Sequence, residues 1–133
     1  MRPDIIDHCA RAVTQTRYCI DRIQWMYPNI TLKYPEINFK LKGEFAGRAY
    51  GERWLIKYNY LLLKLNFQDF IDNTIPHEVA HLVEYAMYGK TGHKETWKNI
   101  MKDLGVKEIT RCHTYKTYPC RKRKDLQRCG VSV

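Results

Sequence analysis

Residues 75–85 read IPHEVAHLVEY, with two histidines four positions apart and a glutamate directly after the first. Residues four apart on a helix lie on one face, so His77 and His81 can direct both imidazoles at a single ion. Glu78 lies about 100° further round the helix, where its carboxylate can hold a water beside the metal instead of binding the metal. The motif predicts a hydrolytic zinc site with His77 and His81 as ligands and Glu78 as general base.

The residues around the motif favour this interpretation. Val79, Ala80, Leu82 and Val83 make the rest of the helix apolar, which predicts that it is buried. A single histidine on an apolar face is usually a core residue that has found a hydrogen bond. Two histidines at this spacing, with a glutamate between them, indicate a metal site instead.

A catalytic zinc ion takes a third protein ligand and keeps an open position. The downstream candidates are His93, His113, Glu84 and Glu95. Spacing favours His93 over Glu95, because the loop after Gly89 is long enough to turn back to the preceding helix. Glu84 lies on the same side of the helix as the histidines, so it can instead hydrogen-bond a ligand.

Hydrophobic periodicity predicts an α+β domain. Residues 4–27 form one amphipathic helix, which Pro28 ends. Alternation predicts strands at 37–41, 49–50 and 54–58, closing a small antiparallel meander.

The remaining residues before Gly105 are predicted to be helical. A short helix spans 59–65. Residues 67–88 are helical, but broken so that a new helix starts at Pro76, capped by Asn73 or Thr74. A last helix spans about 94–104.

Size and composition are those of one globular domain. The chain has 133 residues, of which 44% are hydrophobic, and its apolar runs are too short to span a bilayer. The N-terminal residues lack the apolar segment of a secretory signal, and the five cysteines show no paired CxxC spacing. We expect a cytoplasmic protein with reduced thiols and no membrane partner.

The net charge of +9 is concentrated near the C-terminus. Residues 106–133 hold eight Lys or Arg against two acidic residues, a net charge of +6. Basic residues interleaved with Tyr115 and Tyr118 suit contact with nucleic acid, although a solvated tail has the same composition. The candidate nucleic-acid contacts are Lys116, Arg121, Lys122, Arg123, Lys124 and Arg128.

An ordered series of residues extends well beyond the motif. It comprises Gly47-Arg48-Ala49, Asn59, Leu61-Leu62-Leu63, Phe70-Ile71, Ile75-Pro76, His77-Glu78-Val79-Ala80-His81, Tyr88-Gly89, Gly92-His93, Trp97, Met101, Leu104-Gly105 and Arg111-Cys112-His113-Thr114-Tyr115. Over residues 39–115 this series resembles the SprT-like zinc metalloproteases, the family that includes Spartan.

The resemblance implies a zincin-like fold of the minigluzincin type over residues 1–115, with one catalytic zinc ion. It implies His93 as the third ligand beside His77 and His81, and Glu78 as the base. Characterised members of this family cleave proteins crosslinked to DNA. A protein substrate and DNA, single- or double-stranded, are therefore the expected partners, in the cytoplasm or at the nucleoid or nucleus according to the host.

The C-terminal residues depart from the family's pattern. Many relatives carry a zinc ribbon with two CxxC pairs, whereas residues 116–133 form a basic tail in which only Cys120 and Cys129 remain. The ribbon has been lost, or the chain is a minimal version. A second metal site at Cys112, His113, Cys120 and Cys129 is disfavoured by its irregular spacing.

His113 and Tyr115 are candidates for stabilising an oxyanion or contacting substrate, although packing of a last strand explains them as well. We expect a monomer that cleaves proteins bound or crosslinked to DNA, and two other functions stay open. One is a DNA-binding or regulatory zinc protein with a silent protease site, which the intact Glu78 disfavours. The other is a general zinc peptidase unrelated to DNA.

Overall fold

The computed structural model describes residues 3–107 and residue 109. The predicted helix at the N-terminus is α1, which spans Pro3–Met26, one residue earlier than expected. Its inner face includes Ala12, Thr16, Ile20 and Ile23, all at most 1% exposed, and packs against α4. No helix in the described part of the chain is long and apolar enough to cross a membrane.

The sheet is mixed, so the predicted antiparallel meander is wrong. Its strands are β1 (Glu36–Asn38), β2 (Gly47–Tyr50) and β3 (Leu55–Tyr58), in the order β1-β3-β2. β2 pairs with β3 in antiparallel fashion, but β1 pairs with β3 in parallel. β3 is the most deeply buried of the three strands, and the central position covers both its edges. The loop of residues 39–46 carries the chain from one edge of the sheet to the other.

Asn59 joins the sheet to the next helix. It is the N-cap of α2 (Tyr60–Leu65), where its side-chain oxygen accepts a hydrogen bond from the Leu62 N–H. Its amide nitrogen donates to the carbonyls of Gly43 and Phe45, each at 3.0 Å. One side chain therefore starts the helix and holds the loop between β1 and β2.

The predicted break before Pro76 is absent. The segments α3 (Phe67–Asp69), η1 (Phe70–Thr74) and α4 (Ile75–Tyr88) follow one another without a gap, and η1 is a π-helical turn. Asn73 lies inside η1 with its side chain donating to Asp69, and Thr74 has helical backbone angles and no side-chain capping hydrogen bond, so the expected cap is wrong as well. The widened turn ends two residues before Pro76, whose missing N–H and bulky ring an unbroken α-helix does not accommodate.

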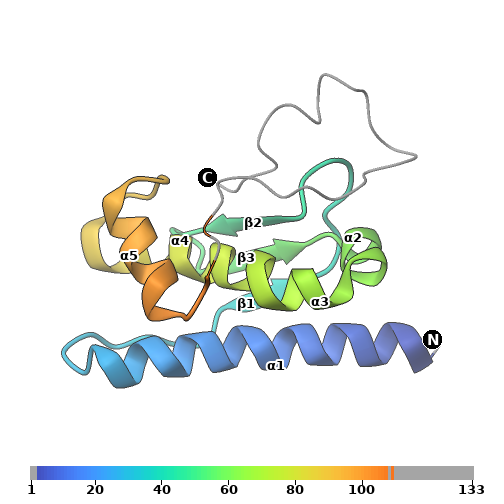
Figure 1. The fold of residues 1–133 in the computed structure, drawn as a ribbon, viewed down its shortest axis with the longest axis horizontal. Coiled ribbons are helices and arrows are strands. Elements are labelled where there is room, and N and C mark those ends of the chain that lie inside the picture. Colours follow the sequence, from blue (N-terminus) through green and yellow to red (C-terminus); the bar gives the residue numbers. More distant parts are fainter. Residues whose placement is uncertain (1–2, 108, 110–133) are drawn as a thin grey trace.

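α4 is the centre of the molecule. It contacts α1, β2 and α5 (Glu95–Asp103), and residues 75–84 are all buried (Figure 1). Gly89, with φ +73°, ends α4 as predicted. The segment 89–94 then returns the chain to α5, which packs beside α4.

Candidate metal centre

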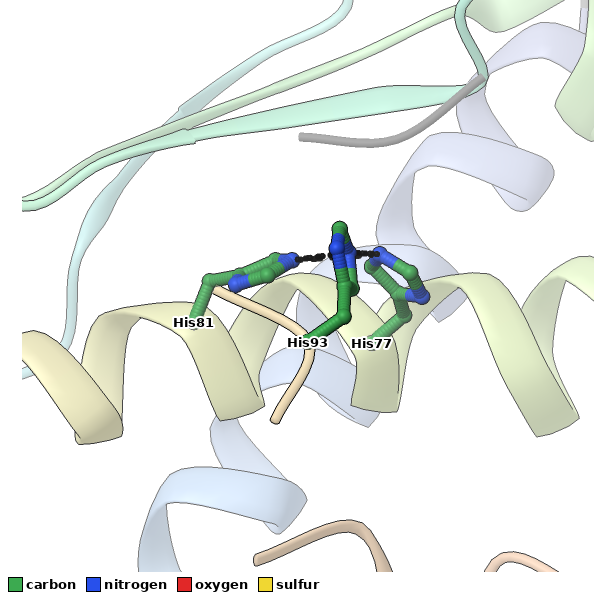
Figure 2. A group of neighbouring side chains, drawn as sticks. All are labelled: His77, His81 and His93. Carbon is green, nitrogen blue, oxygen red and sulfur yellow. Dashed lines mark hydrogen bonds between the residues drawn. The ribbon is translucent and has the colours of Figure 1, made fainter. Parts of the chain in front are cut away.

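Three histidines meet at one point. His77 and His81 come from consecutive turns of α4, and His93 comes from the loop between α4 and α5 (Figure 2). Their Nε2 atoms form a triangle, with distances of 3.2 Å from His77 to His81, 3.0 Å from His81 to His93, and 3.3 Å from His93 to His77. These three residues form a group that can hold a metal ion.

Hydrogen bonds alone do not account for this triangle. A protonated ring nitrogen only donates and an unprotonated one only accepts, so at most two of the three pairs can be hydrogen-bonded at once. Tetrahedral ligands about 2.0–2.1 Å from zinc lie roughly 3.3–3.4 Å apart, close to the observed spacing. The donor set therefore fits a metal ion with three imidazole ligands.

The surroundings of His81 favour the neutral ring that binds metals. Burial, followed by the charge of His93, lowers the pKa of His81 to about 3. Its Nδ1 lies 2.5 Å from the Thr91 hydroxyl oxygen. A metal ion on Nε2 would leave the proton on Nδ1, which would then donate to Thr91 and fix the tautomer and the ring orientation.

Trp97 of α5 packs against all three imidazoles. The centroid of its fully buried ring lies 4.9 Å from that of His77, 5.6 Å from that of His81 and 4.8 Å from that of His93. The indole N–H points to the His77 carbonyl oxygen at 3.4 Å. This one side chain restricts the rotamers of the three rings, a role that the sequence analysis, where Trp97 was only part of the family series, did not foresee.

The two acidic candidates for third ligand lie outside the histidine group. Glu84 is buried, and its carboxylate accepts hydrogen bonds from the Gly92 N–H at 2.9 Å and from the Thr96 hydroxyl. Glu95 is exposed in the first turn of α5. Glu84 therefore bonds the loop that carries His93, and not an imidazole as the sequence had suggested. His113, the remaining candidate, lies outside the described residues.

Glu78 is held in a narrow space between α4 and the sheet. Its side chain is 1% exposed and lies against Gly47, the first residue of β2. A Cβ atom at residue 47 would be 2.8 Å from the Glu78 Cγ and 3.1 Å from its Cδ. Only glycine allows the strand to approach this closely. Gly47 had entered the sequence argument only as part of a motif.

Comparison with models of protein families identifies the family of this chain. The model of the SprT-like family matches residues 16–117, which include α4, the histidine group and Trp97. The chain belongs to the SprT-like family. No solved structure matches it.

Bacterial members of the family give the same result. Protein SprT of Pseudomonas savastanoi pv. phaseolicola is 43% identical over 87 residues, which are 64% of this chain and 53% of that protein. Protein SprT of Pseudomonas putida GB-1 is 38% identical over 97 residues, 71% of this chain and 59% of that protein. The chain thus spans little more than half the length of these relatives.

The candidate centre predicts that metal affinity depends on His93. Replacing His93 with alanine should weaken zinc binding by more than about 100-fold, because one of three protein ligands is lost. Competition with a chromophoric chelator measures this. His8→Ala is the matched control, since His8 packs on Phe67 in another part of the molecule. Equal affinity of the His93 variant and wild type would contradict the site.

The contact between Gly47 and Glu78 predicts a cost for any side chain at residue 47. Gly47→Ala should lower the free energy of unfolding of the metal-free protein by about 1–3 kcal/mol, because the new methyl group overlaps the Glu78 side chain. Urea denaturation measures this. Gly92→Ala is the control, since a Cβ there meets no atom within 4 Å. Equal free energies of unfolding in the two variants would show that the Glu78 side chain moves aside without loss of stability.

Proposed function

We propose that this chain is a zinc-dependent metalloendopeptidase with a zincin-like fold. The observation that carries the proposal is the triangle of Nε2 atoms, with a buried glutamate on the same turn of the helix as one of the ligands. His77, His81 and His93 would hold the ion. Membership of the SprT-like family supports the same function.

Zinc is the ion that this ligand set favours. Three neutral imidazoles with no thiolate or carboxylate among them are a common catalytic zinc set, and the hard ions Mg²⁺ and Ca²⁺ prefer oxygen ligands. When bound, zinc would lower the pKa of a water molecule and polarise the carbonyl group of the scissile peptide.

Glu78 would transfer the proton. Its carboxylate takes a proton from the attacking water and returns it to the leaving amine, so it must be ionised at the start of each cycle. Packing against Gly47 restricts the carboxylate to one side of α4. An intact glutamate here argues against the silent-protease alternative, because a structural metal site needs no general base.

The edge of β2 is the best candidate surface for the substrate. An extended peptide can add to an exposed edge through main-chain hydrogen bonds, which recognise the backbone and not the sequence. Two strands, β3 and β2, are candidates for this edge. β3 is paired on both sides, so we assign the role to β2, whose other edge has no partner strand among the described residues. β2 packs on α4, with Gly47 against Glu78, and Gly51, directly after the strand, lies against the ring of Tyr85.

We further propose that the substrates are proteins bound or crosslinked to DNA. The support is the family resemblance and the net charge of +6 in residues 106–133, most of which lie outside the described residues. The roles of His113, Tyr115 and the basic residues of the tail, the division at residue 115, the cytoplasmic location and the monomeric state stay predictions. The alternative is a general peptidase unrelated to DNA, and the next experiments distinguish it from the proposed protease.

Glu78→Gln should remove turnover without releasing the metal. The substitution spares all three histidines but abolishes the base, so protein cleavage should fall by about 10²–10⁴-fold while zinc affinity stays within a few-fold of wild type. A gel assay of casein or histone cleavage after zinc loading, beside metal analysis of the same samples, measures both. Cleavage at the wild-type rate would exclude Glu78 as the base.

Deleting residues 116–133 should weaken DNA binding and reduce its dependence on salt. The deletion removes six Lys or Arg residues, and each lost phosphate contact lowers the slope of log K against log salt by about 0.9 for duplex DNA. Fluorescence anisotropy at several salt concentrations, with single- and double-stranded oligonucleotides, measures the slope. The cleavage assay with and without DNA completes the test, because cleavage indifferent to DNA would favour the general peptidase.

A further inference from the structure

The loop that carries His93 needs something to hold it in place. His77 and His81 are fixed by the backbone of α4, but His93 lies on the segment 89–94 between two helices. A side chain presented by a loop is less precisely placed than one presented by a helix unless neighbouring groups restrain it. Two side chains of α4 bond this loop: His81 contacts Thr91, and Glu84 contacts Gly92.

Glu84 forms hydrogen bonds to residues on both sides of His93, one in the loop and one in α5. One carboxylate oxygen accepts the Gly92 N–H at 2.9 Å, directly before His93, and the other accepts the Thr96 hydroxyl in the first turn of α5. Glu84 is 2% exposed and lies one turn of α4 beyond His81. Two bonds to a rigid, buried helix therefore fix the position of the histidine between them.

The chemical nature of Glu84 argues for a specific task. A carboxyl group at a position that is 2% exposed is unfavourable unless its oxygens find donors, and its α4 neighbours Ala80, Val83 and Met87 are apolar. An apolar residue at position 84 would pack there but would leave the Gly92 N–H without this acceptor. Bonds to an ionised acceptor are also stronger than bonds between neutral groups, which suits a restraint on a loop.

The same loop also orients a second ligand. Thr91, one residue before Gly92, contacts His81 Nδ1 through its hydroxyl. Fixing the loop therefore sets the position of His93 and the ring orientation of His81 together. A loose loop would therefore disturb two of the three histidines.

We propose that Glu84 is a positioning residue, which holds the segment 91–96 in its metal-binding arrangement before any metal is bound. The proposal rests on the metal site described above but adds a separate claim about the metal-free protein. Glu84 acts through Gly92 and Thr96 and does not itself bind the ion, because both its oxygens are bonded to the loop and to α5.

The direct test compares Glu84→Ala with Glu84→Gln in the full chain. In the metal-free protein, the Gly92 amide should exchange with solvent at least about 10-fold faster in the alanine variant, measured by NMR. Zinc affinity from chelator competition should fall by about 10–100-fold. The glutamine variant keeps one acceptor oxygen for Gly92, so both effects should be smaller.

Thr96 provides a matched pair in case the Glu84 variants fold poorly. Thr96→Val removes the hydroxyl at nearly constant volume and should weaken zinc binding by about 10-fold, whereas Thr96→Ser keeps the hydroxyl and should restore wild-type affinity. The absorption spectrum of the cobalt-substituted protein should change in the valine variant only. Thr16→Val, which removes a buried hydrogen bond to Tyr58, controls for a general loss of stability.

The outcomes separate this proposal from the proposed function. Unchanged Gly92 exchange and zinc affinity in Glu84→Ala would overturn it, as would an equal loss of affinity in Thr16→Val. Should wild type itself fail to bind zinc, the proposed function fails, but the exchange of Gly92 still decides whether Glu84 holds the loop.

Discussion

The structure depends on placing two imidazoles and two carboxylates on a helix that is buried over ten consecutive residues. Polar groups in such a place are unfavourable unless each finds a partner, so the surrounding elements must supply donors, acceptors or a metal ion. The loop after α4 supplies His93 and the Thr91 hydroxyl, and α5 supplies Thr96 and the ring of Trp97. The polar residues of α4 therefore determine which hydrogen-bonding and metal-binding groups the neighbouring elements must supply.

The helical segment before α4 supplies partners for the first backbone N–H groups of that helix. The π-helical turn Phe70–Thr74 keeps the chain helical up to Pro76, so α4 is anchored through α3 and η1 instead of beginning at a free end. A helix starting at Pro76 would leave its first N–H groups without partners one residue away from His77. Continuity with the preceding turns removes that requirement and leaves the turn that carries His77 with a well-defined backbone.

Local patterns in the sequence predict most of the helices and the histidine group, but not the long-range pairings. Apolar periodicity locates α1 within one residue, and the spacing of His77 and His81, with the loop after Gly89, points to the three histidines that the structure brings together. The mixed sheet was missed because alternation identifies a strand without naming its neighbour. The contacts of Trp97 and Gly47 were missed for the same reason, since both depend on packing between distant elements.

The two buried carboxylates of α4 face different neighbours, so they have different proposed roles in the site. Glu84 lies six positions after Glu78, which places the two side chains about 120° apart around the helix. Glu78 packs against β2, while Glu84 bonds the loop and α5. The proposed base is thus positioned by the sheet, and the third ligand is positioned by the helical side of the molecule. A substrate strand adding to β2 would meet the base at the edge of the sheet without disturbing the bonds that hold His93.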